Sequence, residues 1–177
     1  MGASGYTGSE TLRLLMRHPY VKIIELIAEK NAGKNISEVF SNFNGSNLPI
    51  IKSLENTNFS NVDVLFSCAP SGVLADYIDK LHNNLVIIDL SSDFRFKDVV
   101  TYNSYYGTHK NPSFLPKFCY GLSEIYREEI REKQYISCPG CYPTSVLLPL
   151  VPLLKEGLIK NNEVIIDSKS GITGAGR

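Results

Sequence analysis

The sequence lacks an excess of charge of either sign. Its 177 residues include 18 basic and 18 acidic side chains, so the formal net charge is zero. Nucleic acids and anionic membranes bind proteins through clustered positive charge, so we expect neither as a partner. No apolar run approaches the roughly 20 residues that cross a bilayer, and no basic segment followed by an apolar one opens the chain. We therefore expect a cytoplasmic protein without a secretory signal.

Cysteine is also scarce, with four residues in the chain. Cys68 lies in an apolar run, and we interpret Cys68 and Cys119 as small buried side chains. Cys138 and Cys141 form a C-x-x-C pair, a spacing found in dithiol redox centres and in metal sites. A zinc site needs two further well-placed ligands. The other cysteines and the three histidines are scattered, so we expect no metal.

Strand-like and helix-like segments alternate along the chain, which predicts an α/β fold with a largely parallel sheet. Apolar runs predict strands over residues 21–28, 48–52, 62–69, 85–90 and 163–169. Helical spacing of apolar residues predicts helices over residues 5–18, 73–82, 123–133 and 142–156. Residues 91–118 show few regular signals. We expect Ser123 to cap its helix, and we expect Pro149 and Pro152 to kink or interrupt the last one.

The chain opens with three glycines at the spacing G-x-x-G-x-x-G, at Gly2, Gly5 and Gly8. Such glycines allow a tight turn and let the backbone approach a pyrophosphate, whose charge then faces the helix start. With the alternating segments, they favour a Rossmann-like doubly wound sheet that binds a dinucleotide. The alternative is a glycine turn that only caps a helix.

The end of the second strand of such a fold contacts the ribose of the cofactor. An acidic residue there suits a free 2′-hydroxyl, and a basic one suits a 2′-phosphate. Glu29 and Lys30 stand side by side at this place, with Lys34 nearby. These residues therefore do not decide between NAD and NADP, and ordinary surface charge is an equal alternative.

The C-x-x-C pair stands directly before the helical pattern that starts near Tyr142. N–H groups at a helix start are unpaired and carry partial positive charge, which helps a thiol there to lose its proton. Cys141 adjoins this start, so we interpret it as a single nucleophile, with Cys138 incidental. Three alternatives stay open: a dithiol oxidoreductase that needs both cysteines, a buried pair without chemistry, and a dinucleotide-binding module in which Cys141 has no role.

A dinucleotide site combined with a cysteine at a helix start indicates one kind of reaction. A thiolate attacks an activated acyl group and forms a thioester, which a nicotinamide hydride reduces; the reverse sequence oxidises an aldehyde. The negative oxygen that develops during the attack needs N–H donors, and a helix start supplies them.

Five strings carry a resemblance that spans the chain. They are GASGYTG at residues 2–8, DLSSDFR at 89–95, YGLSE at 120–124, PGCYPT at 139–144 and SKSGITGAGR at 168–177. On these strings the chain resembles the N-acetyl-gamma-glutamyl-phosphate reductase family, for which PGCYPT is nearly diagnostic. Aspartate-semialdehyde and glyceraldehyde-3-phosphate dehydrogenases share the chemistry and match the strings less well.

The resemblance implies an NADPH-dependent enzyme of arginine biosynthesis. It would reduce N-acetyl-glutamyl 5-phosphate, an acyl phosphate, to N-acetyl-glutamate 5-semialdehyde and phosphate through a thioester on Cys141. The loop from Gly171 to Arg177 would close over the nicotinamide end near Cys141. The cofactor-binding residues would be Gly2, Ser4, Gly5, Tyr6, Thr7, Gly8, Pro70, Ser71, Gly72, Gly171 and Gly174. The substrate residues would be Arg95, Glu124 and Ser170; for the first two, a structural ion pair or cap is the alternative.

The resemblance also implies a division of the chain. An NADP-binding domain would cover residues 1–140, and the beginning of an α+β catalytic domain would cover 141–177. The full-length enzyme would be a homo-oligomer. The histidine base of the family and further substrate ligands would follow Arg177, so we expect this chain alone to be inactive.

Two positions depart from the family's pattern. Cys138 stands where asparagine is common. The side-chain amide of an asparagine could orient the thiol or donate to the oxyanion, and the cysteine that replaces it is a weaker donor. We hypothesise that Cys138 traps Cys141 in an inactive disulfide. Ser123 stands where proline is usual, which is a minor change.

No apolar strand precedes Gly2, so we expect a fragment that lacks its first strand. In the common strand order this strand lies at the centre of the sheet. Its loss should leave two inner strand edges unpaired, with an apolar slot between them. We expect such a fragment to be unstable or aggregated on its own and to bind NADPH weakly.

Overall fold

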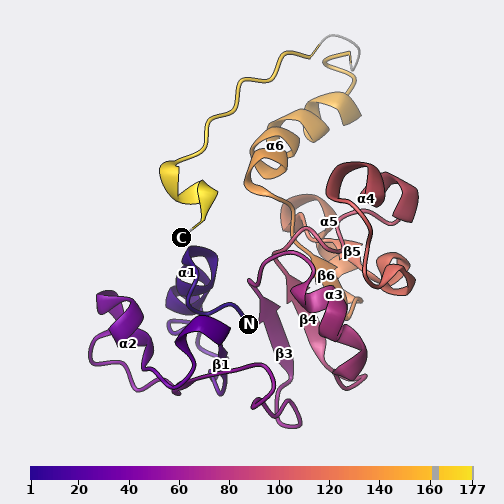
Figure 1. Ribbon diagram of the computed structural model, residues 1–177. Coiled ribbons are helices and arrows are strands. Elements are labelled where there is room, and N and C mark those ends of the chain that lie inside the picture. Colours follow the sequence, from indigo (N-terminus) through magenta and orange to yellow (C-terminus); the bar gives the residue numbers. More distant parts are fainter. Residues whose placement is uncertain (161–163, 177) are drawn as a thin grey trace.

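A computed structural model describes residues 1–160 and 164–176, and it confirms an α/β fold built on parallel strands (Figure 1). One sheet pairs β1 (Leu26–Ile27) with β2 (Ile51–Lys52). The second sheet has the order β3-β4-β6-β5, and each of its pairings is parallel. Its strands are β3 (Val64–Ser67), β4 (Val86–Asp89), β5 (Cys119–Tyr120) and β6 (Tyr135–Ser137).

Helices alternate with these strands along the chain. The α-helices are α1 (Tyr6–Leu15), α2 (Ile36–Val39), α3 (Val73–Tyr77), α4 (Val99–Tyr106), α5 (Ser123–Arg131) and α6 (Cys141–Lys155). Short 3-10 turns cover Glu29–Asn31, Ser41–Phe43, Ile78–Lys80, Pro112–Lys117 and Ile172–Ala175. No helix in the described part of the chain is both long and apolar enough to cross a membrane.

The apolar core has two parts. The larger one joins β3, β4 and α3 through side chains such as Leu65, Ile87 and Leu74. The smaller one packs α1 against the first sheet, and its members include Leu12, Leu26 and Ile51. Each aliphatic side chain buried in this way stabilises the fold by about 1.5–3 kcal/mol. The smaller core therefore holds α1, which begins at the glycine-rich turn, and the larger core holds α3, which follows β3.

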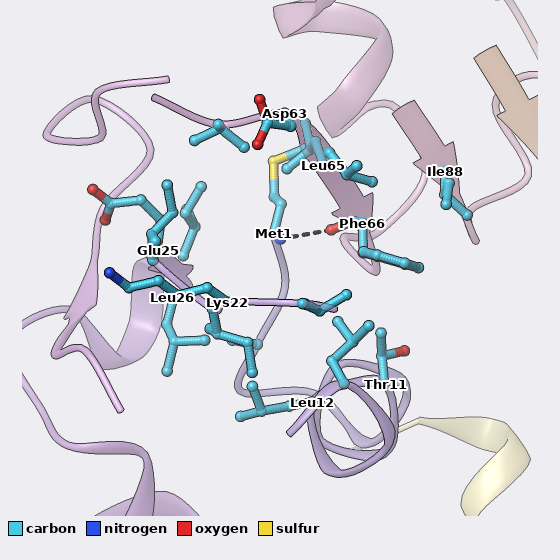
Figure 2. A pocket seen from close by; sticks show the side chains of 18 of the residues that line it. Met1, Thr11, Leu12, Lys22, Glu25, Leu26, Asp63, Leu65, Phe66 and Ile88 are labelled. Carbon is cyan, nitrogen blue, oxygen red and sulfur yellow. Dashed lines mark hydrogen bonds between the residues drawn. The ribbon is translucent and has the colours of Figure 1, made fainter. Parts of the chain in front are cut away.

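The first three residues lie between the two sheets. The Met1 amino group donates to Phe66 O at 2.7 Å, and Cys68 N donates to Met1 O at 2.8 Å. On the other side, the carbonyl of Ile27 accepts from Gly2 N and Ala3 N at 2.8 and 3.0 Å. Below this junction an apolar cavity separates β1 from β3 (Figure 2). The predicted slot is therefore confirmed.

Three predicted strands differ from the structure, and the one over residues 48–52 is confined to Ile51–Lys52. The strand over residues 21–28 shrinks to Leu26–Ile27. Among the described residues its strand partner is β2, which pairs with those two residues, and its other side faces the cavity. Residues 164–169 of the predicted strand 163–169 form no strand, and residue 163 lies outside the described residues. No neighbouring strand pairs with this segment among the described residues, and Ile165 is 99% exposed.

The region 91–118 is more regular than predicted. It contains α4, whose N-cap Asp98 accepts from Thr101 N at 2.7 Å, and the 3-10 turn Pro112–Lys117. The β5 strand that follows this region was also missed. Its two residues are too short a run to show a period.

The predicted cap of α5 was wrong, and the helix with the two prolines is not interrupted. Leu122, not Ser123, is the N-cap of α5, and the Ser123 hydroxyl donates to Glu124 Oε2 at 3.2 Å. Pro149 and Pro152 lie inside α6 without interrupting it. Both prolines are exposed, so water can reach the carbonyls that they leave without an intrahelical donor.

Candidate active site

The parallel strands bring several of the predicted motifs to one edge of the sheet. The loops after β3, β4 and β6 all leave from the carboxyl ends of neighbouring strands, where open α/β sheets bind ligands. Backbone bonds connect these ends: Leu90 N donates to Ser67 O at 2.8 Å and Cys138 N donates to Asp89 O at 2.7 Å. Through Met1, the glycine-rich turn joins the same edge.

The glycine-rich turn has a separate physical reason for each glycine. Gly2 adopts φ +79°, and a Cβ there would lie 2.4 Å from Cys68 O. A Cβ on Gly8 would lie 2.1 Å from Gly2 O, so α1 passes directly against the turn. Gly5 is the N-cap of α1, and a Cβ there would lie 3.5 Å from Gly2 O, an ordinary contact distance. The geometry fits a dinucleotide, because a pyrophosphate can approach Gly5 and the start of α1.

The other predicted residues of this turn lie on the same approach. Tyr6 and Thr7 form the first residues of α1 and are exposed, and Ser4 is half-buried just before the N-cap. Thr11 lies one turn further along, and its hydroxyl is 3.6 Å from the sulfur of Cys68. The turn therefore places polar side chains and helix N–H groups at one place.

The Pro70–Gly72 loop is held by a buried carboxylate that sequence reasoning missed. Asp93 accepts from Gly72 N at 2.7 Å and from Ala75 N at 3.3 Å, so it caps the start of α3. The hydroxyls of Ser71 and Ser92 lie 2.6 Å apart. Asp93 is fully buried, and its own carbonyl lies 2.7 Å from the ring nitrogen of His109. The DLSSDFR string thus positions the loop after β3.

A second buried carboxylate, Asp89, ends β4. It accepts from Ser91 N at 3.1 Å and from the Ser91 hydroxyl at 2.7 Å. Ser67 and Ser137 lie level with it on the neighbouring strands, and all three residues are fully buried. Burial raises the pKa of Asp89 to about 6, although the bonds from Ser91 oppose this shift.

Arg95 lies against the cysteine motif. Its Nε donates to Cys138 O at 3.0 Å, and its Nη2 donates to Leu90 O at 3.1 Å. A Cβ on Gly140 would lie 3.1 Å from Arg95 Nη1, so the guanidinium also borders the residue before Cys141. The structure therefore brings this predicted substrate residue to the motif, where it bonds backbone carbonyls rather than an acidic side chain.

The two cysteines of the motif differ in environment. Cys141 is exposed and is the first residue of α6, after the N-cap Gly140. Thr144 closes this first turn, with its hydroxyl donating to Gly140 O at 2.9 Å. Cys138 is half-buried, and burial, aided by the charge of Asp89, raises the pKa of its thiol to about 11. A thiolate is therefore disfavoured at Cys138, whereas Cys141 is exposed beside the free N–H groups of the first turn of α6.

All four cysteines are free thiols in the described structure. Burial also raises the pKa values of Cys68 and Cys119. Among residues 1–160 and 164–176, no group of three or more cysteine, histidine or acidic side chains could hold a metal ion.

The remaining predicted residues are not brought to the motif by any recorded contact. Glu124 is exposed on α5, and its carboxylate accepts from Ser123. Gly171 and Gly174 lie in an exposed segment that leaves α6 and runs back toward α1 (Figure 1). Ser170 donates to Gly171 O at 3.3 Å, and a Cβ on Gly174 would lie 2.3 Å from its hydroxyl. Arg177 lies outside the described residues.

Named proteins resemble the chain over its whole length. N-acetyl-gamma-glutamyl-phosphate reductases of Ehrlichia canis (strain Jake) and Caldicellulosiruptor saccharolyticus are 46% and 44% identical to it. A protein of Arabidopsis thaliana named "Probable N-acetyl-gamma-glutamyl-phosphate reductase, chloroplastic" is 44% identical. The whole chain aligns with 51%, 52% and 44% of these three proteins, so it spans about half the length of the curated relatives that it matches.

A solved structure and two family matches define the relationship. The structure is aspartate semialdehyde dehydrogenase II of Vibrio cholerae complexed with ASA, at a TM-score of 0.61 and 22% identity over 87% of this chain and 40% of that one, which shows a shared fold. Residues 141–177 match "Semialdehyde dehydrogenase, dimerisation domain". Residues 1–133 match "Semialdehyde dehydrogenase, NAD binding domain". The chain therefore belongs to the semialdehyde dehydrogenase family, and most of it corresponds to that family's NAD-binding domain.

Proposed function

We propose that this chain provides the cofactor site and the nucleophile of an N-acetyl-gamma-glutamyl-phosphate reductase in arginine biosynthesis. The observation that carries the proposal is the exposed Cys141 at the start of α6, at the sheet edge that also holds the glycine-rich turn. Relatives of that name align with the whole chain, PGCYPT included. The substrate would be N-acetyl-glutamyl 5-phosphate, and the products would be the 5-semialdehyde and phosphate.

The chemistry follows from the position of Cys141. Its sulfur attacks the acyl carbon, and the bond to the phosphate oxygen breaks with its electron pair, so phosphate leaves and a thioester remains. N–H groups of the first turn of α6 face the negative oxygen of this step. A nicotinamide cofactor held at the glycine-rich turn would supply the hydride for reduction of the thioester to the aldehyde, which would free the thiol of Cys141. Arg95 holds the carbonyl of Cys138 and so fixes the approach to Cys141.

We propose the remaining predicted residues as binding groups of this reaction. Cofactor phosphates would lie against residues 2–8, with Pro70, Ser71 and Gly72 on the adenosine side and Gly171 and Gly174 at the nicotinamide end. Arg95, Glu124 and Ser170 would contact the substrate. We also propose that the cofactor domain covers residues 1–140 and that the catalytic domain begins at residue 141.

We propose NADPH, rather than NADH, as the reductant. Glu29 Oε1 accepts from Leu54 N at 2.8 Å, so one of its oxygens is engaged by the backbone. Lys30 and Lys34 follow in the same exposed stretch after β1. A 2′-phosphate would therefore meet two ammonium groups at the place where a free hydroxyl would need an available carboxylate.

We propose that the enzyme is a homo-oligomer in the cytoplasm. The match of residues 141–177 to a dimerisation domain supports the assembly. No residue of the apolar helix α6 is buried, and Leu158 is 70% exposed just beyond it. Such a surface is typical of protein interfaces. Reduced thiols persist in the cytoplasm, which suits a cysteine nucleophile.

Acyl transfer to Cys141 tests the function directly. The protein is incubated with N-acetyl-glutamyl 5-phosphate in the absence of nicotinamide cofactor and analysed by peptide mass spectrometry. We expect an N-acetyl-glutamyl group on Cys141, no label in Cys141→Ser, and unchanged labelling of Cys141 in the matched Cys138→Ser variant.

Other outcomes would change the assignment. Label on Cys138, or no label although iodoacetamide alkylates Cys141, would contradict the proposed nucleophile. A count of free thiols with and without reductant tests the predicted Cys138–Cys141 disulfide, and an identical count would exclude it.

A further inference from the structure

The loop after β3 ends in a tight turn that carries Ser71 at its corner. Val73 N donates to Pro70 O at 3.3 Å, and Gly72 has φ +88° and ψ −21°, close to the angles of the third residue of a type II turn. Asp93 accepts from Gly72 N at 2.7 Å, so that N–H is already used within the protein. Ser71 is exposed, so its hydroxyl can meet a ligand at this corner.

The loop that carries this corner borders the glycine-rich turn. A Cβ on Gly2 would lie 2.4 Å from Cys68 O and 2.7 Å from Ala69 N, so the two segments touch just after β3 ends. Ser71 follows two residues later, at the same edge of the sheet. On the placement proposed above, the adenosine half of the cofactor passes this corner.

Behind Ser71, two further hydroxyls lead into the protein. The hydroxyl oxygens of Ser71 and Ser92 lie 2.6 Å apart, and the Ser92 hydroxyl also forms a hydrogen bond with the phenol of Tyr102 on α4. Ser92 and Tyr102 are buried, whereas Ser71 is exposed. The three groups therefore form a chain of hydroxyls from the core to the cofactor edge, which we call the hydroxyl chain.

The direction of these hydrogen bonds follows from the buried end. A buried phenol O–H usually donates to a partner, and among residues 1–160 and 164–176 the Tyr102 phenol has no side-chain partner other than Ser92. Burial and the charge of Asp93 raise the pKa of Tyr102, so the phenol keeps its proton. Tyr102 therefore donates to Ser92, and Ser92 donates to Ser71. The proton of Ser71 is then left to point away from the protein.

We propose that Tyr102 and Ser92 are positioning residues for the cofactor, which orient the Ser71 hydroxyl as a hydrogen-bond donor to an oxygen of the adenosine half of the bound dinucleotide. Each O–H in such a chain polarises the next, so the last donor is stronger than a lone hydroxyl. This inference rests on the dinucleotide site of the proposed function. It adds two buried residues that act on the cofactor through Ser71.

The test is a double-mutant cycle on cofactor affinity, measured by the change in NADPH fluorescence as the 177-residue chain is added. Ser71→Ala should weaken binding about tenfold, and Tyr102→Phe about threefold. In the Ser71→Ala background, Tyr102→Phe should cause no further loss, because the phenol acts through the hydroxyl that is already removed.

Tyr106→Phe is the matched control for the loss of a phenol. Tyr106 lies on the same helix, and its ring centroid is 5.2 Å from that of Tyr102, but its hydroxyl is not part of the hydroxyl chain. We expect this variant to bind NADPH as the parent chain does. Tyr102→Phe itself keeps the ring that packs edge-on against His109 at 4.5 Å, so we expect it to remain folded.

A second ligand locates the oxygen that Ser71 contacts. Adenosine 2′,5′-bisphosphate carries the adenine, the ribose and the 2′-phosphate of NADPH, and its affinity is measured by displacement of NADPH. We expect Ser71→Ala and Tyr102→Phe to weaken its binding by the same factors as for NADPH. Losses for NADPH with none for adenosine 2′,5′-bisphosphate would contradict a contact with the adenosine half.

The remaining outcomes separate positioning from a general structural effect. Equal NADPH affinities of the parent, Ser71→Ala and Tyr102→Phe would overturn the proposal, as would additive losses in the double variant. These results would leave the proposed function intact, whereas a parent chain that binds no NADPH would refute the cofactor site as well. If Tyr102→Phe melts below the assay temperature, Ser92→Ala breaks the same chain and takes its place in the cycle, with the same expected result.

Discussion

Of the three glycines in the turn, Gly8 is the one at which an added Cβ would come closest to other backbone atoms. In Gly8→Ala the added Cβ would lie 2.1 Å from Gly2 O, 2.8 Å from Gly2 C and 2.9 Å from Ala3 Cα. All three atoms belong to the backbone, so no side chain can rotate away. To reach an ordinary contact, α1 or the turn must move by about 1 Å, against the close packing of the interior.

The magnitude follows from this displacement. Overpacking of this kind costs about 1–3 kcal/mol in the free energy of unfolding. For a chain of this length each kcal/mol lowers the melting temperature by roughly 2–4 °C, so we expect a fall of roughly 2–12 °C. Cofactor binding should weaken as well, because Gly2 and the N–H groups at the start of α1 shift together.

Gly5→Ala is the matched control. Gly5 has φ −89°, and its Cβ would meet Gly2 O at an ordinary 3.5 Å. Alanine is a poorer N-cap than glycine, but it restricts the unfolded chain, and the two effects nearly cancel, within about 0.5 kcal/mol. The methyl group would, however, stand where a pyrophosphate approaches. We therefore expect near-normal stability with weaker cofactor binding.

Urea unfolding followed by circular dichroism gives the stabilities, and quenching of NADPH fluorescence gives the affinities. The expected pattern is loss of both quantities in Gly8→Ala and loss of affinity alone in Gly5→Ala. Equal stability of the parent chain and Gly8→Ala would refute the claim that the turn and α1 touch at this point. Normal affinity of Gly5→Ala for NADPH would refute the placement of the pyrophosphate.

Three further predictions concern single side chains. The folded pKa of Asp89 is raised from 3.8 to about 6, so its contribution to stability is full below pH 4 and is lost as the pH rises toward 6, by up to about 3 kcal/mol. Asp89→Asn should flatten urea-unfolding stability over this window, and an unchanged pH profile would contradict the burial argument. Asp93→Ala removes the acceptor of Gly72 N and Ala75 N and should lower stability by about 1.5–3 kcal/mol. Ser92→Ala loses neutral hydroxyl contacts, with Ser71 and Tyr102, and should cost about 1 kcal/mol; similar losses in the two variants would speak against the capping role. Replacing Lys30 and Lys34 by alanine should weaken NADPH binding about tenfold or more and leave NADH binding unchanged, and parallel losses for both cofactors would count against a 2′-phosphate site.

The sequence predicted the order of the elements better than their lengths. Alternating apolar runs located β1, β2, β3 and β4, because buried parallel strands are continuously apolar. The lengths depend on neighbours that no local pattern shows. Residues 21–25 are as apolar as a strand, yet no strand in the described part of the chain pairs with them, and they stay irregular. Residues 164–169 likewise form no strand, because no strand among the described residues pairs with them.

The motifs at the site were visible in the sequence, but the residues that hold them were not. Cys141 at a helix start follows from the apolar pattern after it, and the start of α6 confirms that position. Asp93 was hidden, because an acidic residue in a polar stretch is usually a surface charge, and only the fold brings it to the start of α3. The difference between Cys138 and Cys141 is likewise tertiary, since burial raises the pKa of one and α6 exposes the other.

The residues at the start of the glycine-rich turn are held by both sheets. Met1 bonds to β3, and Gly2, the next residue, bonds to Ile27 O. The two bonds of Met1, to Phe66 O and from Cys68 N, join the turn to the loop after β3, and the Thr11 hydroxyl of α1 lies 3.6 Å from the sulfur of Cys68. The position of the cofactor turn relative to that loop therefore depends on tertiary contacts, which the spacing of the three glycines alone does not show.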